Sequence, residues 1–172
     1  DAHDKPMNEF DLAAVAQASV EDLTASAQGK HITLTHACTP VTMVGMEDAV
    51  RLMITNLMDN AIRYTPEGGR IEVAVRPDGD CHALITVTDD GPGIAPEERT
   101  RVFERFYRAL GTKVSGTGLG LAIVSRIVQM HNGTITINDG FVRPPRDGEP
   151  EGFGAQFAVR FPLCAEAGKP GL

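Results

Sequence analysis

The sequence is poor in cysteine and has no tryptophan. Its three cysteines, Cys38, Cys81 and Cys164, are isolated and odd in number, which argues against a disulfide framework and against a CxxC metal site. The five histidines show neither an HExxH pattern nor another ligand spacing. We therefore expect a reducing compartment, and no metal centre built from cysteine or histidine.

Positive charge and long hydrophobic runs are also scarce. The 16 lysines and arginines against 23 acids give a net charge of −7, which disfavours a nucleic-acid partner held by phosphate contacts. No apolar run approaches the roughly 20 residues that a membrane span requires, and no signal peptide is visible. A chain of 172 residues, 42% of them hydrophobic, can bury one core without disulfides. We expect residues 1–172 to form a single domain that does not itself contact a membrane.

Hydrophobic periodicity predicts both helices and strands. The stripe Val50, Met53, Ile54, Leu57 and Ala61 has helical spacing, and an aspartate at position 11 suits an N-cap. Helices are expected at about 11–28, 46–65 and 118–131, and strands at 30–36, 41–44, 71–76, 81–88, 134–138 and 154–161. The first two strands are expected in one sheet, residues 1–9 as a tail and residues 141–152 as a loop. The fold class is then α+β, a two-layer α/β sandwich in which three helices cover a mixed, mostly antiparallel sheet of about five strands.

Two glycine clusters predict a nucleotide site. The first, Asp89-Asp90-Gly91-Pro92-Gly93, follows the apolar run 83–87, so a carboxylate stands where a strand ends and the chain turns. The second, residues 116–120, leads into the apolar stretch 121–128, and backbone amides at such a helix start can bind anions. The clusters therefore suggest a base end and a phosphate end.

Several common phosphate-binding motifs are absent. Gly116, Gly118 and Gly120 are spaced GxGxG rather than GxGxxG, and the downstream ribose acid of a Rossmann site is missing. There is no GxxxxGK[ST] P-loop, and there is neither HRD nor DFG of the eukaryotic protein kinases. The phosphate chemistry must be of another kind.

Polar and basic side chains accompany the clusters. Asn56, Asn60 and Arg63 fall at i, i+4 and i+7 of the second helix, in one row beside its apolar stripe, with Tyr64 nearby. This row either faces water or borders a cleft. Between the clusters lie five cations, which could be a solvated helix face, but the flanking glycines favour anion binding. They are Arg99, Arg101, Arg105, Arg108 and Lys113.

Four segments occur in an order typical of one family. They are NLMDNAIRYT (56–65), DDGPGI (89–94), VFERFYR (102–108) and GTGLGLAIV (116–124). These segments resemble the N, G1, F and G2 boxes of bacterial sensor histidine kinases. The chain is similar to their catalytic and ATP-binding domain, whose Bergerat fold is shared with gyrase, mismatch-repair ATPases and a heat-shock chaperone. The resemblance covers nearly the whole chain and implies ATP and Mg²⁺ as cofactors.

The resemblance also implies roles for individual residues. Asp89 would accept a hydrogen bond from the adenine amino group, while Gly91 and Gly93 shape the base pocket. Asn60 would hold the Mg²⁺ that bridges the phosphates, and Asn56 lies one turn earlier on the same side. Catalytic roles then fall to Asn56, Asn60 and Arg108.

A lid over the nucleotide is expected at residues 95–117. Phe103 and Phe106 match the anchoring F box, Arg108 is a candidate for the γ-phosphate, and the second glycine cluster would form the hinge and triphosphate cradle. The nucleotide-binding set that the resemblance implies is Asn60, Arg63, Tyr64, Asp89, Gly91, Gly93, Ile94, Phe103, Phe106, Lys113, Gly116, Thr117, Gly118, Leu119, Gly120 and Leu121.

The implied activity is transfer of the ATP γ-phosphoryl group to a histidine on a separate dimerisation domain of the same parent kinase, with a response regulator downstream. The domain would be cytoplasmic and its parent anchored in the inner membrane. The sequence has no HE[LF]RxP-like segment of its own, and His3 in AHDKP lacks that setting. Two alternatives remain, a serine/threonine kinase of the anti-sigma type and a nucleotide-gated binding module without catalysis. The FYR segment and the long lid favour the histidine kinase.

Overall fold

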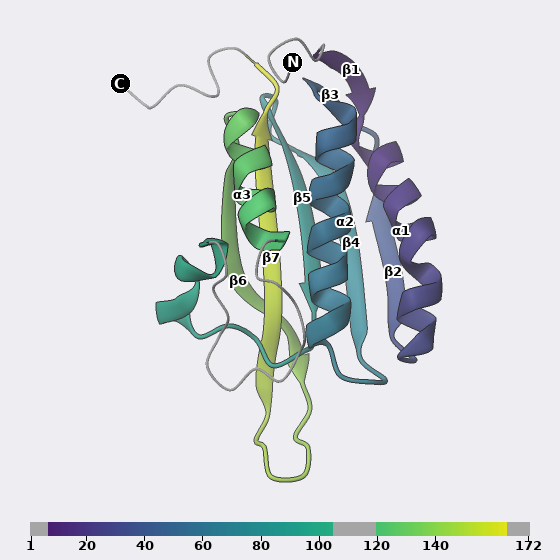
Figure 1. The fold of residues 1–172 in the computed structure, drawn as a ribbon, viewed down its shortest axis with the longest axis vertical. Helices are drawn as coiled ribbons and strands as arrows, with labels where there is room; N and C mark the ends of the chain where they lie inside the picture. The colour runs from purple at the N-terminus through teal and green to yellow at the C-terminus, as the bar shows by residue number, and fades with distance from the viewer. Residues whose placement is uncertain (1–6, 105–119, 165–172) are drawn as a thin grey trace.

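Three helices form one layer of the structure, as the periodicity predicts. The computed structural model describes residues 7–104 and 120–164. In it α1 spans Leu12–Gly29, α2 spans Glu47–Tyr64 and α3 spans Gly120–Met130 (Figure 1). The predicted stripe of α2 is buried throughout, and the side chain of Asp11 caps α1 by accepting a hydrogen bond from the Ala13 N–H at 3.0 Å. Among the described helices, none is long and apolar enough to cross a membrane.

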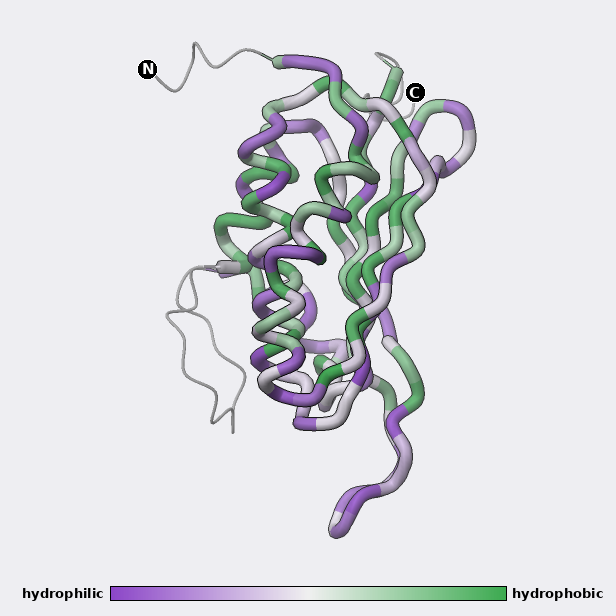
Figure 2. The backbone as a smooth tube through the Cα atoms, turned by 90° about the vertical axis from the view of Figure 1, so that its right-hand side faces the viewer, coloured by the Kyte–Doolittle hydropathy of each residue, from purple (hydrophilic) through white to green (hydrophobic). Residues whose placement is uncertain are grey.

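A five-stranded sheet forms the second layer. Its order is β2-β4-β5-β7-β6, with β2 parallel to β4 and every other neighbour antiparallel. The strands are β2 (Thr33–Cys38), β4 (Arg70–Asp78), β5 (His82–Asp89), β6 (Thr134–Arg143) and β7 (Gly152–Pro162). This confirms the predicted α+β class and the mixed, mostly antiparallel sheet. Figure 2 shows the helical layer beside the sheet and a β6–β7 hairpin that extends beyond both, with a hydrophilic tip.

The core lies between the two layers. Alternate residues of the central strands β4, β5 and β7 are buried, among them Val73, Ile85 and Phe157, whereas their neighbours along each strand are more exposed. They join the buried stripes of the helices in one hydrophobic cluster. The sheet is thereby held against α2, the helix that carries the predicted polar row.

Two predictions about the N-terminal part are wrong. The strand expected at 41–44 is β3 (Thr42–Gly45), and it pairs antiparallel with β1 (Asn8–Asp11) in a separate two-stranded sheet. Residues 8 and 9 are therefore strand, not part of a tail. The reason is tertiary: Phe10 is buried opposite Met43, a contact that local periodicity cannot show.

The loop expected at 141–152 is also too long. β6 continues to Arg143 and β7 begins at Gly152, so the two strands pair on either side of a short connection at 144–151. A bulge between Asp139 and Val142 bends the ladder where the hairpin leaves the sheet. The prolines that suggested a loop, Pro144, Pro145 and Pro150, all lie in this connection, so neither strand contains them. We call residues 139–154 the β6–β7 arm.

His131 has the structural role that the missing ligand spacing predicts. Its ring is buried and its Nε2 accepts a hydrogen bond from the Met46 N–H at 3.0 Å, while Nδ1 lies 2.8 Å from the carbonyl oxygen of Ile127. This arrangement places the ring proton on Nδ1. The ring also packs edge-on against Phe161, with centroids 5.6 Å apart. The end of α3 is thus tied to the start of α2.

We predict that Asp11→Ala lowers the free energy of unfolding by about 1–2 kcal/mol, the usual effect of losing an N-cap. The same carboxylate oxygen also accepts the Val41 N–H at 3.0 Å, so the substitution breaks the junction of α1 with β3 as well as the cap. Urea unfolding followed by circular dichroism measures the change. The control is Asp22→Ala, which removes an exposed pair with Arg51 and should change stability by less than about 0.5 kcal/mol. Equal effects of the two substitutions would contradict the capping role.

Candidate functional site

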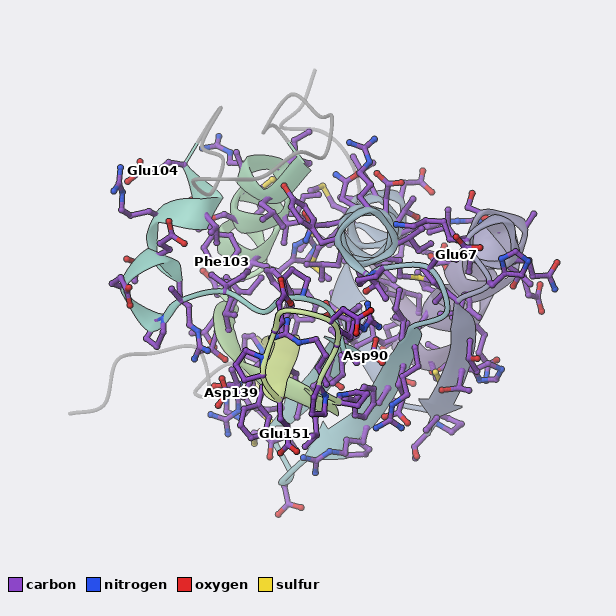
Figure 3. All side chains as sticks on the ribbon, turned by 90° about the horizontal axis from the view of Figure 1, so that it is seen from below. Glu67, Asp90, Phe103, Glu104, Asp139 and Glu151 are labelled. Atoms are coloured by element: carbon purple, nitrogen blue, oxygen red, sulfur yellow. The ribbon has the colours of Figure 1, made fainter. Side chains whose placement is uncertain are left out.

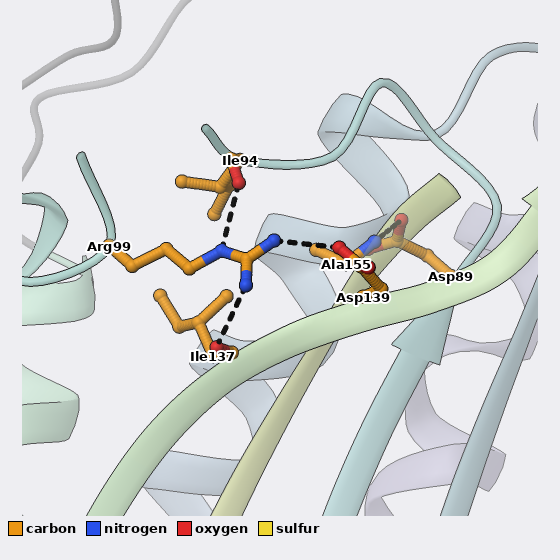
Figure 4. Close-up of polar contacts among 6 residues, drawn as sticks. All are labelled: Asp89, Ile94, Arg99, Ile137, Asp139 and Ala155. Carbon is orange, nitrogen blue, oxygen red and sulfur yellow. Dashed lines mark hydrogen bonds and ion pairs between the residues drawn. The ribbon is translucent and has the colours of Figure 1, made fainter. Parts of the chain in front are cut away.

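Asp89 is the centre of the candidate site. It is the last residue of β5, and only 5% of its surface is exposed. Its Oδ1 accepts two backbone hydrogen bonds, from Gly91 N–H at 2.9 Å and from Ala155 N–H on β7 at 3.1 Å. Figure 4 shows the bond from Ala155. Both bonds go to Oδ1, so Oδ2 takes part in neither. The carboxylate is held in one orientation by the turn that follows it and by the neighbouring strand.

Burial has an electrostatic consequence for Asp89. Loss of solvation raises the pKa of its carboxyl above the ordinary value, and the nearby Asp90 adds to the rise. The hydrogen bonds from Ala155 and Gly91 oppose this shift because they stabilise the ionised form. Desolvation is the larger effect, so the pKa of Asp89 is raised in spite of its two hydrogen bonds.

Asp90 plays a different part from its neighbour. Its Oδ1 accepts a hydrogen bond from the Arg70 N–H at 2.9 Å, which joins the turn after β5 to the first residue of β4. Figure 3 looks at the molecule from below. In that view Asp90 appears lower than the end of α2, with Glu67 to one side of it and Phe103 to the other. Asp90 therefore fixes the backbone of the turn.

Close backbone approaches surround Asp89. Gly93 has φ +75°, and a Cβ there would lie 2.5 Å from the carbonyl oxygen of Phe153. On the other side of the turn, a Cβ at Gly91 would lie 3.1 Å from the carbonyl oxygen of Tyr64, at the end of α2. The turn is thus packed between α2 and the β6–β7 arm.

Two further glycines contact Asp89, and sequence reasoning missed both. A side chain at Gly140 or at Gly154 would overlap the carbonyl oxygen of Asp89. The available signal was glycine inside a strand pattern, at Asp139-Gly140 and at Gly152-Phe153-Gly154, which indicates a bulge or a close backbone approach. The pattern places Gly154 at the start of the last predicted strand and leaves Gly140 outside every predicted element, and it does not indicate that either residue approaches Asp89.

The polar row lies in the second half of α2, whose last residue, Tyr64, approaches the turn after Asp89. Asn56, Asn60 and Tyr64 are half-buried, while Arg63 is exposed and its Nε lies 3.1 Å from Asp59 Oδ2. The end of this helix is capped by Lys30, whose Nζ donates to the carbonyl oxygen of Ile62 at 2.8 Å and of Arg63 at 3.3 Å. A cation on the last carbonyls stabilises the C-terminus of α2.

The segment after the turn begins the predicted lid. Residues 95–104 contain two short 3₁₀ helices, η2 (Pro96–Glu98) and η3 (Arg101–Phe103). Val102 is buried, and Phe103 packs edge-on against Phe157 of β7 with ring centroids 6.3 Å apart. Phe103 thus docks on the sheet, as an anchor would. The remaining lid residues lie outside the described parts of the chain, together with the predicted site residues Phe106, Arg108, Lys113, Gly116, Thr117, Gly118 and Leu119.

Gly120 and Leu121 are the first residues of α3 in the described structure, and both are half-buried. A groove of about 720 Å³ runs between α2, Phe103 and α3, lined mostly by apolar side chains such as Leu52 and Ile123. Among the predicted site residues within 7–104 and 120–164, only Phe103 lines this groove. The groove is therefore distinct from the surroundings of Asp89.

Arg99 has a role that its place among the cations did not predict. Its Nε donates to the carbonyl oxygen of Ile94 at 2.9 Å, Nη1 to that of Ile137 at 3.5 Å and Nη2 to Asp139 Oδ1 at 2.8 Å (Figure 4). The expectation that it belongs to an anion-binding cluster is therefore wrong for this residue. Its guanidinium group joins the chain after the turn to β6, because three acceptors converge there in the folded structure.

Comparison with known proteins agrees with this geometry. A family model described as histidine kinase-, DNA gyrase B-, and HSP90-like ATPase matches residues 45–165, and the chain belongs to this family. The sensor protein kinase PmrB of Pseudomonas aeruginosa is 41% identical over 130 residues, which cover 75% of this chain and 27% of that protein. The chain thus spans about a quarter of the length of this curated relative.

Solved structures extend the likeness to the whole fold. The mycobacterial sensor histidine kinase MprB matches with a TM-score of 0.77 and 31% identity, covering 91% of this chain and 97% of that one. Full-length ShkA in complex with AMPPNP matches with a TM-score of 0.74 and 29% identity, covering 92% of this chain and 32% of that one. These relatives define an ATP-binding catalytic domain of the sensor histidine kinase class, and they favour it over the serine/threonine kinase and the non-catalytic module.

We predict that Asp89→Asn leaves the empty domain at least as stable as the wild type at neutral pH. The raised pKa means that the folded state holds this proton more tightly than the unfolded chain, so the contribution of Asp89 to stability falls as pH rises through the two pKa values. An asparagine can accept the same two N–H bonds without a buried charge. Urea unfolding at several pH values should show that the variant's advantage grows from about pH 4, near the usual aspartate pKa, towards neutrality. A variant less stable than the wild type at neutral pH would contradict this account.

Proposed function

We propose that this domain binds ATP through Asp89 and transfers the γ-phosphoryl group to a histidine on the dimerisation domain of its parent kinase. The observation that carries the proposal is the buried Asp89 carboxylate, whose Oδ1 is held by two backbone donors while Oδ2 makes neither bond. A carboxylate oxygen so placed suits the adenine amino group, a donor that guanine lacks at this position. The AMPPNP complex of the structurally similar ShkA supports an adenine nucleotide as the ligand.

The turn after Asp89 supports the base-binding role. Gly91 and Gly93 bring the backbone close to α2 on one side and to the β6–β7 arm on the other, and Ile94 is half-buried next to them. In our proposal the flat base enters along this turn with Tyr64 of α2 beside it. A hydrogen bond to a desolvated charged acceptor contributes more than one made in water, which gives selectivity between bases.

The polar row of α2 is the proposed site of phosphate and Mg²⁺ binding. The described residues include no cluster of three or more histidine, cysteine or acidic side chains that could hold a metal by themselves. Asn60, with its amide oxygen, fits an ion such as Mg²⁺, which takes few protein ligands and keeps waters and phosphate oxygens. The bound ion would neutralise charge on the phosphates. Asn56 and Arg63 lie beside Asn60 on α2, and we propose the same surroundings for Arg108, Lys113 and the second glycine cluster.

Catalysis in this scheme rests on positioning and charge neutralisation. Phosphoryl transfer requires little covalent work from the protein. The nucleophile is a histidine of the dimerisation domain, and the phosphoryl group then passes to a response regulator. By analogy with full-length relatives, we propose that the parent kinase is anchored in the inner membrane and that this domain lies in the cytoplasm.

We predict that the domain binds ATP and ADP in preference to GTP, and that Asp89→Asn weakens ADP binding about tenfold or more. Losing a hydrogen bond to a charged group costs about 1.5–3 kcal/mol. Isothermal titration calorimetry measures both effects. Asp90→Asn is the matched control: its amide oxygen can still accept the Arg70 N–H, so its affinity should stay within about twofold of the wild type. Equal affinities of the wild type for ATP and GTP would remove the basis for the Asp89 assignment.

We predict that this chain alone does not acquire stable phosphate from labelled ATP, and that an added histidine-bearing dimerisation domain becomes labelled with an acid-labile phosphate. Asn60→Ala should abolish transfer through loss of the Mg²⁺ ligand, with an unchanged circular dichroism spectrum. The control on the same helix is Arg51→Ala, which removes only an exposed ion pair and should transfer normally. Acid-stable label on the partner would indicate a serine/threonine kinase, and Mg²⁺-independent transfer would exclude the role of Asn60.

A further inference from the structure

We infer that Arg99 and Arg143 are positioning residues for nucleotide recognition, because they hold the turn Gly91–Ile94 between them. This inference rests on the proposed function, in which that turn forms the base pocket. Each arginine binds a carbonyl oxygen of the turn. Arg143 binds the first one, that of Gly91, and Arg99 binds the last one, that of Ile94. We refer to the pair as the arginine clasp.

Arg99 reaches from the turn side to the β6–β7 arm. It lies just after the turn, and its side chain is 23% exposed. Besides the Ile94 carbonyl oxygen, its guanidinium group binds the carbonyl oxygen of Ile137 and the carboxylate of Asp139, the residue at which the bulge of β6 begins (Figure 4). The planar group thus joins the end of the turn to one fixed point of the arm.

Arg143 reaches in the opposite direction, from the arm to the turn. It is the last residue of β6, and its Nη1 donates to the carbonyl oxygen of Gly91 at 3.3 Å. Its Nε is buried and has no hydrogen-bond partner within residues 7–104 and 120–164. Gly152 pairs with Arg143 across the hairpin. Its lack of a side chain leaves room for the Arg143 guanidinium group, because a Cβ at Gly152 would lie 2.5 Å from Nη2. The side chain is therefore packed against the hairpin instead of extending into solvent.

The arm has further contacts with the same region. Within the arm, the ring centroid of Phe141 lies 3.7 Å from the guanidinium carbon of Arg70. Ala155, the residue just after the arm on β7, donates its N–H to Asp89 Oδ1. Arg70 also donates its N–H to Asp90. These contacts attach the arm to the strand ends beside the turn, and the two arginines of the clasp attach it to the turn itself.

The composition of the turn explains why a clasp is needed. Gly91-Pro92-Gly93 contains two glycines, and glycine loses more conformational freedom on folding than any other residue. A carboxylate aimed by its neighbours recognises adenine only while the turn keeps one conformation. If the binding conformation is populated only fractionally, the apparent Kd rises by the inverse of that fraction. Binding both ends of the turn keeps the fraction high.

The test measures the Kd of ADP for the 172-residue chain by calorimetry, well below the melting temperature of each variant. Arg99→Ala and Arg143→Ala should each raise Kd about fivefold to tenfold, as a binding-competent fraction of about 10–20% requires. Arg143→Lys, which keeps the charge and one donor, should recover part of the affinity. The matched control is Arg146→Ala at the exposed tip of the same arm, with unchanged Kd.

A second measurement covers loss of stability. Hydrogen exchange in Arg143→Lys should be faster at the amides of residues 91 and 93–95 and unchanged in α1, which separates loosening of the turn from global unfolding. If the wild type does not bind ADP, the proposed function itself is wrong, and the clasp is wrong with it. If the wild type binds ADP and both alanine variants bind it with unchanged Kd, the clasp is overturned whatever their melting temperatures.

Discussion

A buried carboxylate at the end of a central strand is the constraint on which the rest of this structure depends. Ionised Asp89 is removed from water, which is unfavourable unless donors are arranged around it. Two backbone N–H groups meet this need, one from the turn and one from β7. The Ala155 N–H of β7 reaches Asp89 because glycines at 140 and 154 let β6 and β7 approach the backbone of Asp89. The arm, the bulge and the tight turn can all be understood as consequences of that approach.

The two layers contribute different parts of the proposed site. The sheet and its arm orient Asp89 and the turn, whereas the helical layer presents Asn56, Asn60 and Arg63 on α2. The layers meet where Gly91 passes the carbonyl oxygen of Tyr64, and Lys30 caps the same end of α2. The end of the helix is therefore fixed on one side by a cation and on the other by the turn. Such a junction keeps the proposed base and phosphate regions at a constant separation.

The charge distribution makes the need for cations clear. The chain carries a net charge of −7, and the phosphates of a bound nucleotide would add further negative charge to it. An acidic surface repels a nucleotide triphosphate, so neutralising groups must come close to the phosphates. Arg99 is already bound to Asp139 and two carbonyl oxygens, and Arg143 is bound to the carbonyl oxygen of Gly91. We therefore assign neither arginine to the phosphates. The proposed scheme therefore relies on Mg²⁺, Arg63 and the cations of the lid.

Local pattern by itself determined the helices, most strands and the centre of the site. The apolar stripe of α2, the cap at Asp11 and the carboxylate after β5 all depend on neighbours within a few residues, so periodicity and turn chemistry predicted them. Only the tertiary structure decided that β3 pairs with β1, that β6 and β7 extend into an arm, and that Arg99 and Arg143 bind the turn from opposite sides. The physical reason is that the pairing partner of a strand and the hydrogen-bond acceptors of an arginine side chain lie on segments tens of residues away in the sequence. Composition near residue 145 predicted a loop, because a glycine that permits close approach and a glycine that permits a turn look the same in sequence.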